Sequence, residues 1–186
     1  MKMLVMANKY PYNNMVFDDH LQVGEFAVKT RSYNLKYRGP VLFYNSSSVE
    51  PLAMKAYGYP KDQSNLKIII GMANLVEVRP LTHKEARKMV MNFNNLPDIA
   101  VRNLFGKMLD LIESDKEIPD FPFLVNEMGI IAPFRNGLFF LNKKRFQKPI
   151  PFNWPAGPQK PIFIQTARYQ KLHGQILMTQ NSRSYR

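Results

Sequence analysis

The sequence predicts an α+β protein, a small mixed β-barrel with flanking helices and a helical insertion. Three observations lead to this fold class: the strand patterns are short, one long apolar run dominates them, and the helix patterns fall in the connections. The long run covers residues 67–78, and Gly71 within it predicts the bulge or bend that a small barrel needs. A length of 186 residues fits one domain over 1–165, with the insertion at 83–118 and a basic tail at 166–186.

The N-terminal part predicts two helices among three strands. The Tyr-Pro-Tyr segment at 10–12 ends the first apolar strand, because the residue before a proline avoids the helical region. Asn13 or Asn14 is suited to cap the helix that follows, and Gly24 suits its C-terminal end. The predicted elements of this part are strands over 3–9, 26–33 and 40–45 and helices over 13–23 and 49–56.

The remaining part predicts a helical connection followed by short strands. Thr82 and Glu85 have the spacing of a capping box, and apolar residues follow them at helical intervals. A second amphipathic helix is predicted after Pro97. Links rich in Pro and Gly then separate short strands predicted at 129–132, 137–142 and 161–165.

The charge is distributed unevenly along the chain. The sequence has 26 Lys and Arg against 14 Asp and Glu, a formal net charge of +12. Residues 128–186 hold 10 of the basic residues and no acid, and Glu127 is the last acidic residue. A field of one sign attracts polyanions, and phosphate backbones are common intracellular polyanions. The distribution therefore favours a polyanion-binding surface over the alternative, a solvated basic surface that confers only solubility.

The composition excludes several kinds of site. The absence of Cys excludes disulfides, thiolate metal sites and thiol nucleophiles, and three widely spaced His make a His-rich metal centre unexpected. We expect no metal and no cofactor. No apolar run approaches the ~18 residues of a membrane span, and the N-terminus does not have the pattern of a signal peptide. We therefore expect a cytoplasmic protein without a membrane partner; its oligomeric state is left open.

Several segments, taken in order, resemble the ASCH domain family of the PUA-like superfamily. The segments are GEFAVKTRSY (24–33), KYRGPVLFYNS (36–46), IGMANLVEVRPLT (70–82), LFFLNKKRFQKPIP (138–151) and 157–163. The resemblance implies a PUA-like barrel with flanking helices and a cleft beside the 26–33 strand. It also implies recognition of RNA or nucleotides, and some members of the family are reported to act on RNA or on modified nucleosides.

The chain departs from the family pattern at the expected cleft. The family's characteristic Lys aligns with Phe26 and its characteristic Glu with Lys29, so that Arg31 alone is retained. Replacement of an acid by Lys29 converts an acid–base pair into a doubly basic site. This departure weakens an enzymatic interpretation and favours binding of an anion.

Basic side chains form the main candidate site. Lys29 and Arg31 are two residues apart on a predicted strand and therefore share a face. Arg offers two parallel donors to a phosphate and Lys a point charge, so neighbouring cations are suited to clamp one. The alternative is an exposed strand with solvated charges. The residues predicted to bind nucleic acid are Lys29, Arg31, Tyr33, Lys36, Arg38, Lys143, Lys144, Arg145 and Lys148.

Aromatic and hydroxyl side chains add to the candidate site. Tyr10, Tyr12 and Trp154 are candidates to stack on a base, a contact worth ~1–3 kcal/mol in single-strand binders. Core packing is the alternative for each. Ser46 and Ser47 are predicted at a strand end before a helix, where they are suited to bind an anion or, alternatively, to cap that helix.

The leading hypothesis is a nucleic-acid-binding ASCH/PUA-like protein that prefers RNA, holds a nucleotide in a basic cleft and contacts phosphates with a basic C-terminal surface. One alternative is an enzyme, a ribonuclease or amidohydrolase acting on RNA or a modified nucleoside. Its secondary catalytic candidates are Lys29, Glu77 and Glu85, of which the acids lack an evident partner in the sequence. Another alternative is an adaptor that binds a protein partner through the 83–118 helices.

Overall fold

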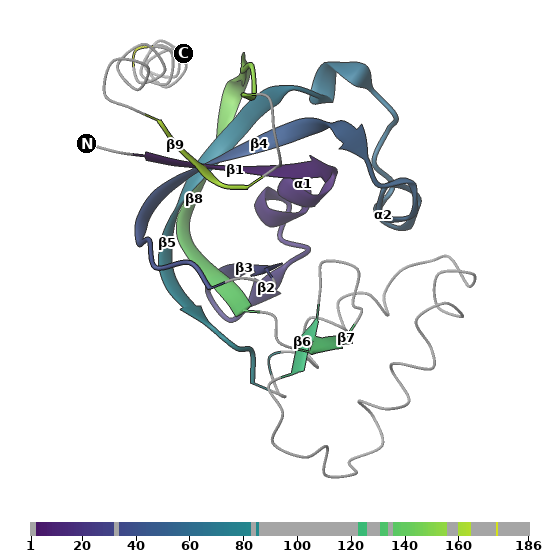
Figure 1. Ribbon diagram of the computed structural model, residues 1–186. Coiled ribbons are helices and arrows are strands. Elements are labelled where there is room, and N and C mark those ends of the chain that lie inside the picture. The colour runs from purple at the N-terminus through teal and green to yellow at the C-terminus, as the bar shows by residue number, and fades with distance from the viewer. Residues whose placement is uncertain are drawn as a thin grey trace, which may run out of the picture.

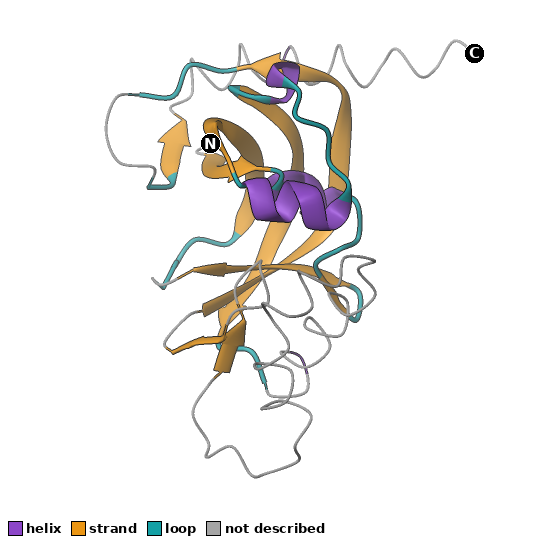
Figure 2. Cartoon of the chain, turned by 90° about the vertical axis from the view of Figure 1, so that its right-hand side faces the viewer, coloured by secondary structure: helices purple, strands orange, loops and turns teal. Residues whose placement is uncertain are grey.

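Strands make up most of the described chain, and the helices are short segments beside them (Figure 1, Figure 2). The computed structural model describes residues 3–31, 34–82, 85, 123–125, 131–133, 136–155, 160–164 and 174. In chain order the elements are β1 (Met3–Tyr10), α1 (Tyr12–Phe17), β2 (Gln22–Val23), β3 (Phe26–Arg31), β4 (Gly39–Val49), α2 (Pro51–Tyr57), the 3₁₀ turn η1 (Gln63–Asn65), β5 (Ile68–Arg79), β6 (Phe123–Val125), β7 (Ile131–Pro133), β8 (Asn136–Pro151) and β9 (Ile162–Ile164).

Seven strands form one mixed sheet in the order β2-β3-β8-β5-β4-β1-β9. β1 and β4 run parallel, with Leu4 opposite Val41, and the other neighbouring strands of this sheet run antiparallel. β6 and β7 form a separate antiparallel pair. The parallel pair places the end of β1 beside the end of β4, with Tyr10 opposite Val49, and α1 follows β1 directly.

The sheet is strongly curved but is not a closed barrel, which corrects the predicted architecture (Figure 1). Three shifts of register between β5 and β8 curl these long strands. Closure would require the edge strands to pair with each other. Within the described residues β2 and β9 lie at opposite edges and pair only with β3 and β1. The edge strands have two and three residues, so each covers little of its neighbour.

Gly71 lies at one of these register shifts, as the sequence predicts for a bulge. A Cβ atom at Gly71 would lie 2.6 Å from Lys144 O and 2.6 Å from Cζ of Phe17. These approaches are closer than carbon atoms tolerate, so only glycine lets β8 and α1 pack against β5 here.

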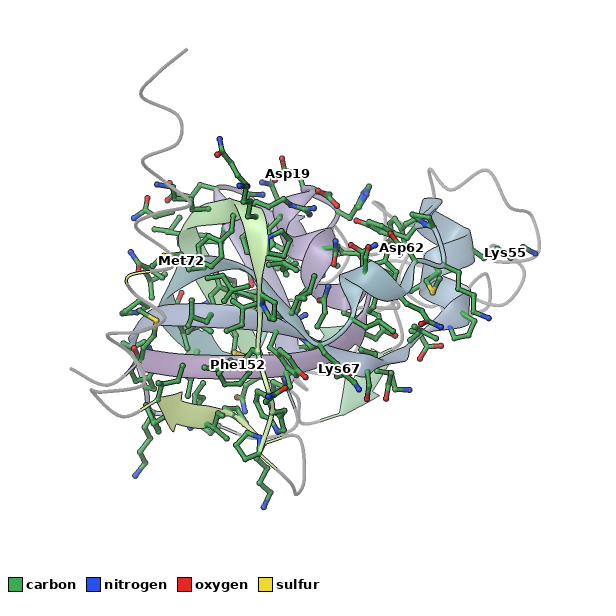
Figure 3. The ribbon with its side chains drawn as sticks, turned by 90° about the horizontal axis from the view of Figure 1, so that it is seen from above. Asp19, Lys55, Asp62, Lys67, Met72 and Phe152 are labelled. Carbon is green, nitrogen blue, oxygen red and sulfur yellow. The ribbon has the colours of Figure 1, made fainter. Side chains whose placement is uncertain are left out.

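The two faces of the sheet bury separate apolar clusters. Side chains alternate along β4, so Val41 and Phe43 join one cluster whereas Leu42 and Tyr44 join the other. The first cluster includes Met15 of α1. The second lies around Phe152, whose N–H donates to Lys67 O at 3.1 Å, and the two labelled residues lie together in Figure 3.

Several predicted elements differ from the observed ones. The helix predicted over 13–23 ends at Phe17, and β2 occupies part of its range. The strand predicted over 137–142 continues to Pro151, because Phe146 and Ile150 are buried on the apolar side of a charged segment. Except for Glu85, the predicted 83–118 insertion lies outside the described residues, as does the tail apart from residue 174.

The predicted capping box is confirmed at its two described residues. Thr82 N donates to Glu85 Oε2 at 2.8 Å, and Glu85 N donates to Thr82 Oγ1 at 3.3 Å. No helix in the described part of the chain is long and apolar enough to span a membrane.

Candidate functional site

Lys29 and Arg31 extend from the same face of β3, as predicted, but Lys29 is not on the surface. Its residue exposure is 0%, whereas Arg31 is half-buried. Lys29 Nζ donates to Tyr12 O at 3.3 Å and lies 6.0 Å from the centre of the Tyr12 ring. The alternative of an ordinary solvated strand is therefore wrong for Lys29, whose ammonium reaches the first residue of α1.

Arg31 belongs to a chain of side-chain amides that crosses from β3 to β4. One guanidinium nitrogen of Arg31 donates to Asn8 Oδ1, and another donates to Thr30 O at 2.7 Å. Asn8 Nδ2 donates to Asn13 Oδ1 at 2.7 Å, and Asn13 Nδ2 donates to Tyr44 O at 2.8 Å. We call Lys29, Arg31, Asn8, Tyr12 and Asn13 the β3 cluster.

The sequence predicts that Asn13 or Asn14 caps a helix, and it gives Asn8 no role. In the structure both lie inside α1, whose N-cap residue is Pro11. Asn14 Oδ1 accepts from Asn45 Nδ2 at 2.9 Å in the interior, with both residues buried. The one available signal was the unusual density of Asn after an apolar strand, which does not identify the partners.

The basic residues of β8 lie on the surface and are partly neutralised. Arg145 Nη2 donates to Asp18 Oδ1 at 2.7 Å, and Lys143 Nζ forms an ion pair with Asp19. In Figure 3, Asp19 is labelled beside the bend of β8. Partial burial lowers the pKa of Lys143, although Asp18 acts in the opposite direction. We call the four predicted cations of this strand the β8 surface: Lys143, Lys144, Arg145 and Lys148.

The same β8 cations also hold α1. Lys143 Nζ donates to Val16 O at 3.2 Å, and Arg145 Nη2 donates to Asn14 O at 3.3 Å. The last carbonyls of a helix carry partial negative charge, so cations at these positions stabilise it. Lys144 and Lys148 are exposed. Lys29 reaches the other end of α1, so cations from β3 and from β8 contact the two ends of this helix.

Of the predicted stacking residues, Tyr12 is the one that lies in the β3 cluster, where it is half-buried. Tyr10 is 1% exposed, and its ring packs edge-on against Tyr59 at 6.0 Å, so its predicted stacking role does not fit. Trp154 is half-buried and stacks on Tyr44 at 5.1 Å, in the second core cluster. Tyr33 lies outside the described residues.

Lys36 and Arg38 are exposed in the segment before β4. Arg38 donates to Leu35 O at 2.7 Å and to Tyr37 O at 2.8 Å, and these bonds hold it within its own segment. The described contacts of Arg38 therefore do not bring it to Lys29, although the sequence predicts that these cations bind nucleic acid together.

The structure places the two predicted serines within a strand and not at its end. Ser46 and Ser47 lie within β4, which continues to Val49 because its pairing with β1 extends to that residue. The N-cap residue of α2 is Glu50, so the serines do not precede the helix as predicted. Ser46 is buried, and its Oγ accepts from Ser48 N at 3.2 Å.

The two acidic candidates for catalysis both bind Arg79. Glu85 accepts two bonds from its guanidinium, at 2.6 and 2.7 Å, and Glu77 Oε1 lies 3.0 Å from Arg79 Nε. The bonds from Arg79, followed by those from Thr82, lower the pKa of Glu85 to about 2. So acidic a carboxyl is a weak base at neutral pH, and the geometry gives no support to Glu85 as a general base.

No protein-family model and no curated protein matches the chain. Among solved structures it is similar to ASCH from Zymomonas mobilis, at 13% identity and a TM-score of 0.48, over 92% of this chain and 94% of that one. Two mutants of that protein are similar at 12% identity and a TM-score of 0.48, over 93–94% of this chain and 95–98% of theirs.

Proposed function

We propose that the protein binds nucleic acid, RNA in preference to DNA, and holds a phosphate of one nucleotide at the β3 cluster. The observation that carries the proposal is the placement of Lys29 and Arg31 side by side on β3, with Lys29 fully buried. The β8 surface contacts further phosphates along the strand of nucleic acid.

Burial of a cation is costly, because a charged group loses its hydration when it leaves water. A fold that keeps Lys29 inside the sheet also gains a strong local positive potential, which lower effective permittivity increases. Arg31 adds a planar donor group suited to a phosphate, and the amides of Asn8 and Asn13 make the surroundings polar. These features support an anionic ligand rather than an apolar one.

Tyr12 supports a nucleotide over a free phosphate. Its half-buried ring lies beside Lys29, so a phosphate held by Arg31 in the field of Lys29 brings the attached sugar and base close to an aromatic side chain. Stacking of a base on an aromatic ring contributes ~1–3 kcal/mol. The preference for RNA rests on the resemblance of the sequence segments to ASCH domains.

Fluorescence anisotropy with matched single-stranded and duplex RNA and DNA tests the proposal. We expect binding of single-stranded RNA with a slope of log K against log [salt] of about −0.7 per phosphate neutralised. Lys29→Met combined with Arg31→Met is expected to weaken binding by at least about tenfold, since bonds between ionised groups are strong.

The matched control combines Lys55→Met with Lys61→Met, two exposed lysines whose loss makes the same change in net charge. It is expected to weaken binding less than about threefold. Circular dichroism and the thermal midpoint verify that each variant is folded. Absence of binding to every oligonucleotide at low salt would contradict the proposal, as would equal losses in the two double variants.

A further inference from the structure

We infer that Asn8 and Asn13 are positioning residues that orient the guanidinium of Arg31 toward a bound phosphate. The inference rests on the proposed function, because it assigns these residues a task at the same site. The three hydrogen bonds that connect Arg31, Asn8, Asn13 and Tyr44 O form what we call the amide relay.

The orientation of each amide follows from hydrogen-bond chemistry. Tyr44 O is a main-chain carbonyl and can only accept, so the NH₂ group of Asn13 must face it. The oxygen of Asn13 then faces Asn8 and requires a donor, which is the Asn8 NH₂ group. Asn8 therefore presents its oxygen to Arg31, whose guanidinium can only donate. A flip of either amide would place two donors or two acceptors against each other.

The relay is rigid because its origin is buried in the sheet. Asn13 is 0% exposed, and its bond to Tyr44 O is a buried contact between α1 and β4. Asn8 lies on β1, where Ala7 is opposite Tyr44 and Asn8 is opposite Asn45 in the parallel pairing. The relay thus connects Arg31 to α1, β1 and β4, in addition to its bond to Thr30 O on its own strand.

An amide is better suited to this task than a carboxylate. Asn8 Oδ1 accepts a bond from Arg31 and restricts its guanidinium, yet it adds no negative charge to the site. An aspartate of almost the same shape would still accept from Arg31, but it would lose the donor to Asn13 Oδ1, form an ion pair with Arg31 and reduce the attraction for a phosphate. Asn8 therefore selects for an anionic ligand as well as positioning the group that binds it.

A double-mutant cycle between Asn8 and Arg31 tests the inference, with affinity for a single-stranded RNA oligonucleotide as the readout. We expect Asn8→Ala to weaken binding by about tenfold, the effect of losing a bond to a charged group. In the Arg31→Met background the same change should have no further effect, because Asn8 acts through Arg31. Asn13→Ala should behave similarly, and Asn74→Ala on β5 is the control expected to bind normally.

Asn8→Asp provides a second readout that a purely structural role would not change. This variant retains the side-chain volume and the acceptor for Arg31, loses the donor to Asn13 Oδ1 as Asn8→Ala does, and adds one negative charge. We expect its salt slope to become shallower by about 0.7, the contribution of one phosphate, whereas Asn8→Ala should weaken binding with an unchanged slope.

Additive losses from Asn8→Ala and Arg31→Met would overturn the inference and leave the proposed function intact. The same holds if Asn8→Asp binds with the wild-type slope. Absence of RNA binding by the wild-type protein would overturn both, and thermal midpoints distinguish a loss of binding from a loss of folding.

Discussion

The β3 cluster and the β8 surface are both basic, but they differ in how deeply their cations are buried. Lys29 is completely buried, and the described bonds of Lys29 and Arg31 end on carbonyl and amide oxygens. Arg145 keeps 43% of its side chain exposed and bonds the carboxylate of Asp18. In the second region, acids from elsewhere in the chain partly neutralise the cations.

The difference shows that the charge of a segment is not the charge of a surface. The segment 128–186 contains no acid, yet Asp18 and Asp19 meet its cations after folding. Asp18 and Arg145 are 127 residues apart in the sequence. By contrast, β3 carries only two cations, Lys29 and Arg31, and Lys29 is fully buried.

The largest expected effect is found by replacing one lysine with methionine in each region and comparing the losses of affinity. Lys29→Met should weaken binding of single-stranded RNA by about 10–100-fold, because the buried charge adds a strong positive potential beside Arg31 where the effective permittivity is low. Lys144→Met, at an exposed position of β8, should weaken it by less than about fivefold. Anisotropy titrations at one salt concentration make the comparison, and equal losses would show that burial gives Lys29 no special role.

A second prediction concerns the contact on which the arrangement of both regions depends. Gly71→Ala should destabilise the protein by about 1–3 kcal/mol, because its Cβ would collide with Lys144 O and the Phe17 ring. Gly58→Ala is the matched control: its Cβ meets no atom within 4 Å, and its positive φ of 68° should cost about 1 kcal/mol. Urea unfolding measures both, and an equal or smaller loss at Gly71 would show that β8 and α1 can yield there.

Local patterns in the sequence were sufficient for the elements whose partners are close. The apolar run of 3–9 predicts β1, the alternation from Phe26 places Lys29 and Arg31 on one face, and the spacing of Thr82 and Glu85 predicts their reciprocal bonds. In each case the pattern that predicts the structure extends over only a few neighbouring residues.

The parts that were not predicted depend on contacts between distant residues. Asn13 donates to a carbonyl 31 positions away, so its sequence neighbours favour a cap while its tertiary partner determines its role. The end of β8 carries charges on its exposed side and only Phe146 and Ile150 as buried signals, so hydropathy does not extend the strand to Pro151. Lys29 is buried, and its ammonium donates to Tyr12 O of α1, 17 positions away in the sequence.

A third prediction uses Arg79 as an example of a cation that has a stabilising role. The folded-state pKa of Glu85 is lowered to about 2 from 4.5. The ionised carboxylate therefore contributes to the free energy of unfolding above about pH 4.5, and this contribution is lost as pH falls toward 2. Glu85→Gln should therefore cost about 2 kcal/mol at pH 7 and little near pH 2. Denaturant unfolding at several pH values measures this. Glu50→Gln, at a partly exposed pair with Lys9, is the control with a smaller cost, and a pH-independent loss at Glu85 would contradict the prediction.

The smallest expected effect is a gain, and it tests the β8 surface directly. Asp18→Asn combined with Asp19→Asn should strengthen RNA binding by a few fold, because Arg145 and Lys143 lose the carboxylates that compete with phosphate. The salt slope should steepen by up to about 1.4, the contribution of two phosphates on a single strand. In Asp18→Asn the single amide oxygen can still accept from Arg145, and the NH₂ group can donate to the Tyr59 hydroxyl, so folding should be retained.

The control for this gain combines Glu25→Gln with Glu50→Gln, which changes net charge equally on other surfaces. If both double variants bind more tightly by the same factor, overall charge explains the effect and the β8 surface has no specific role. If the aspartate variant alone binds more tightly and with a steeper slope, its acids occupy phosphate positions. If neither changes, the nucleic acid does not reach β8, and the β3 cluster alone accounts for the binding.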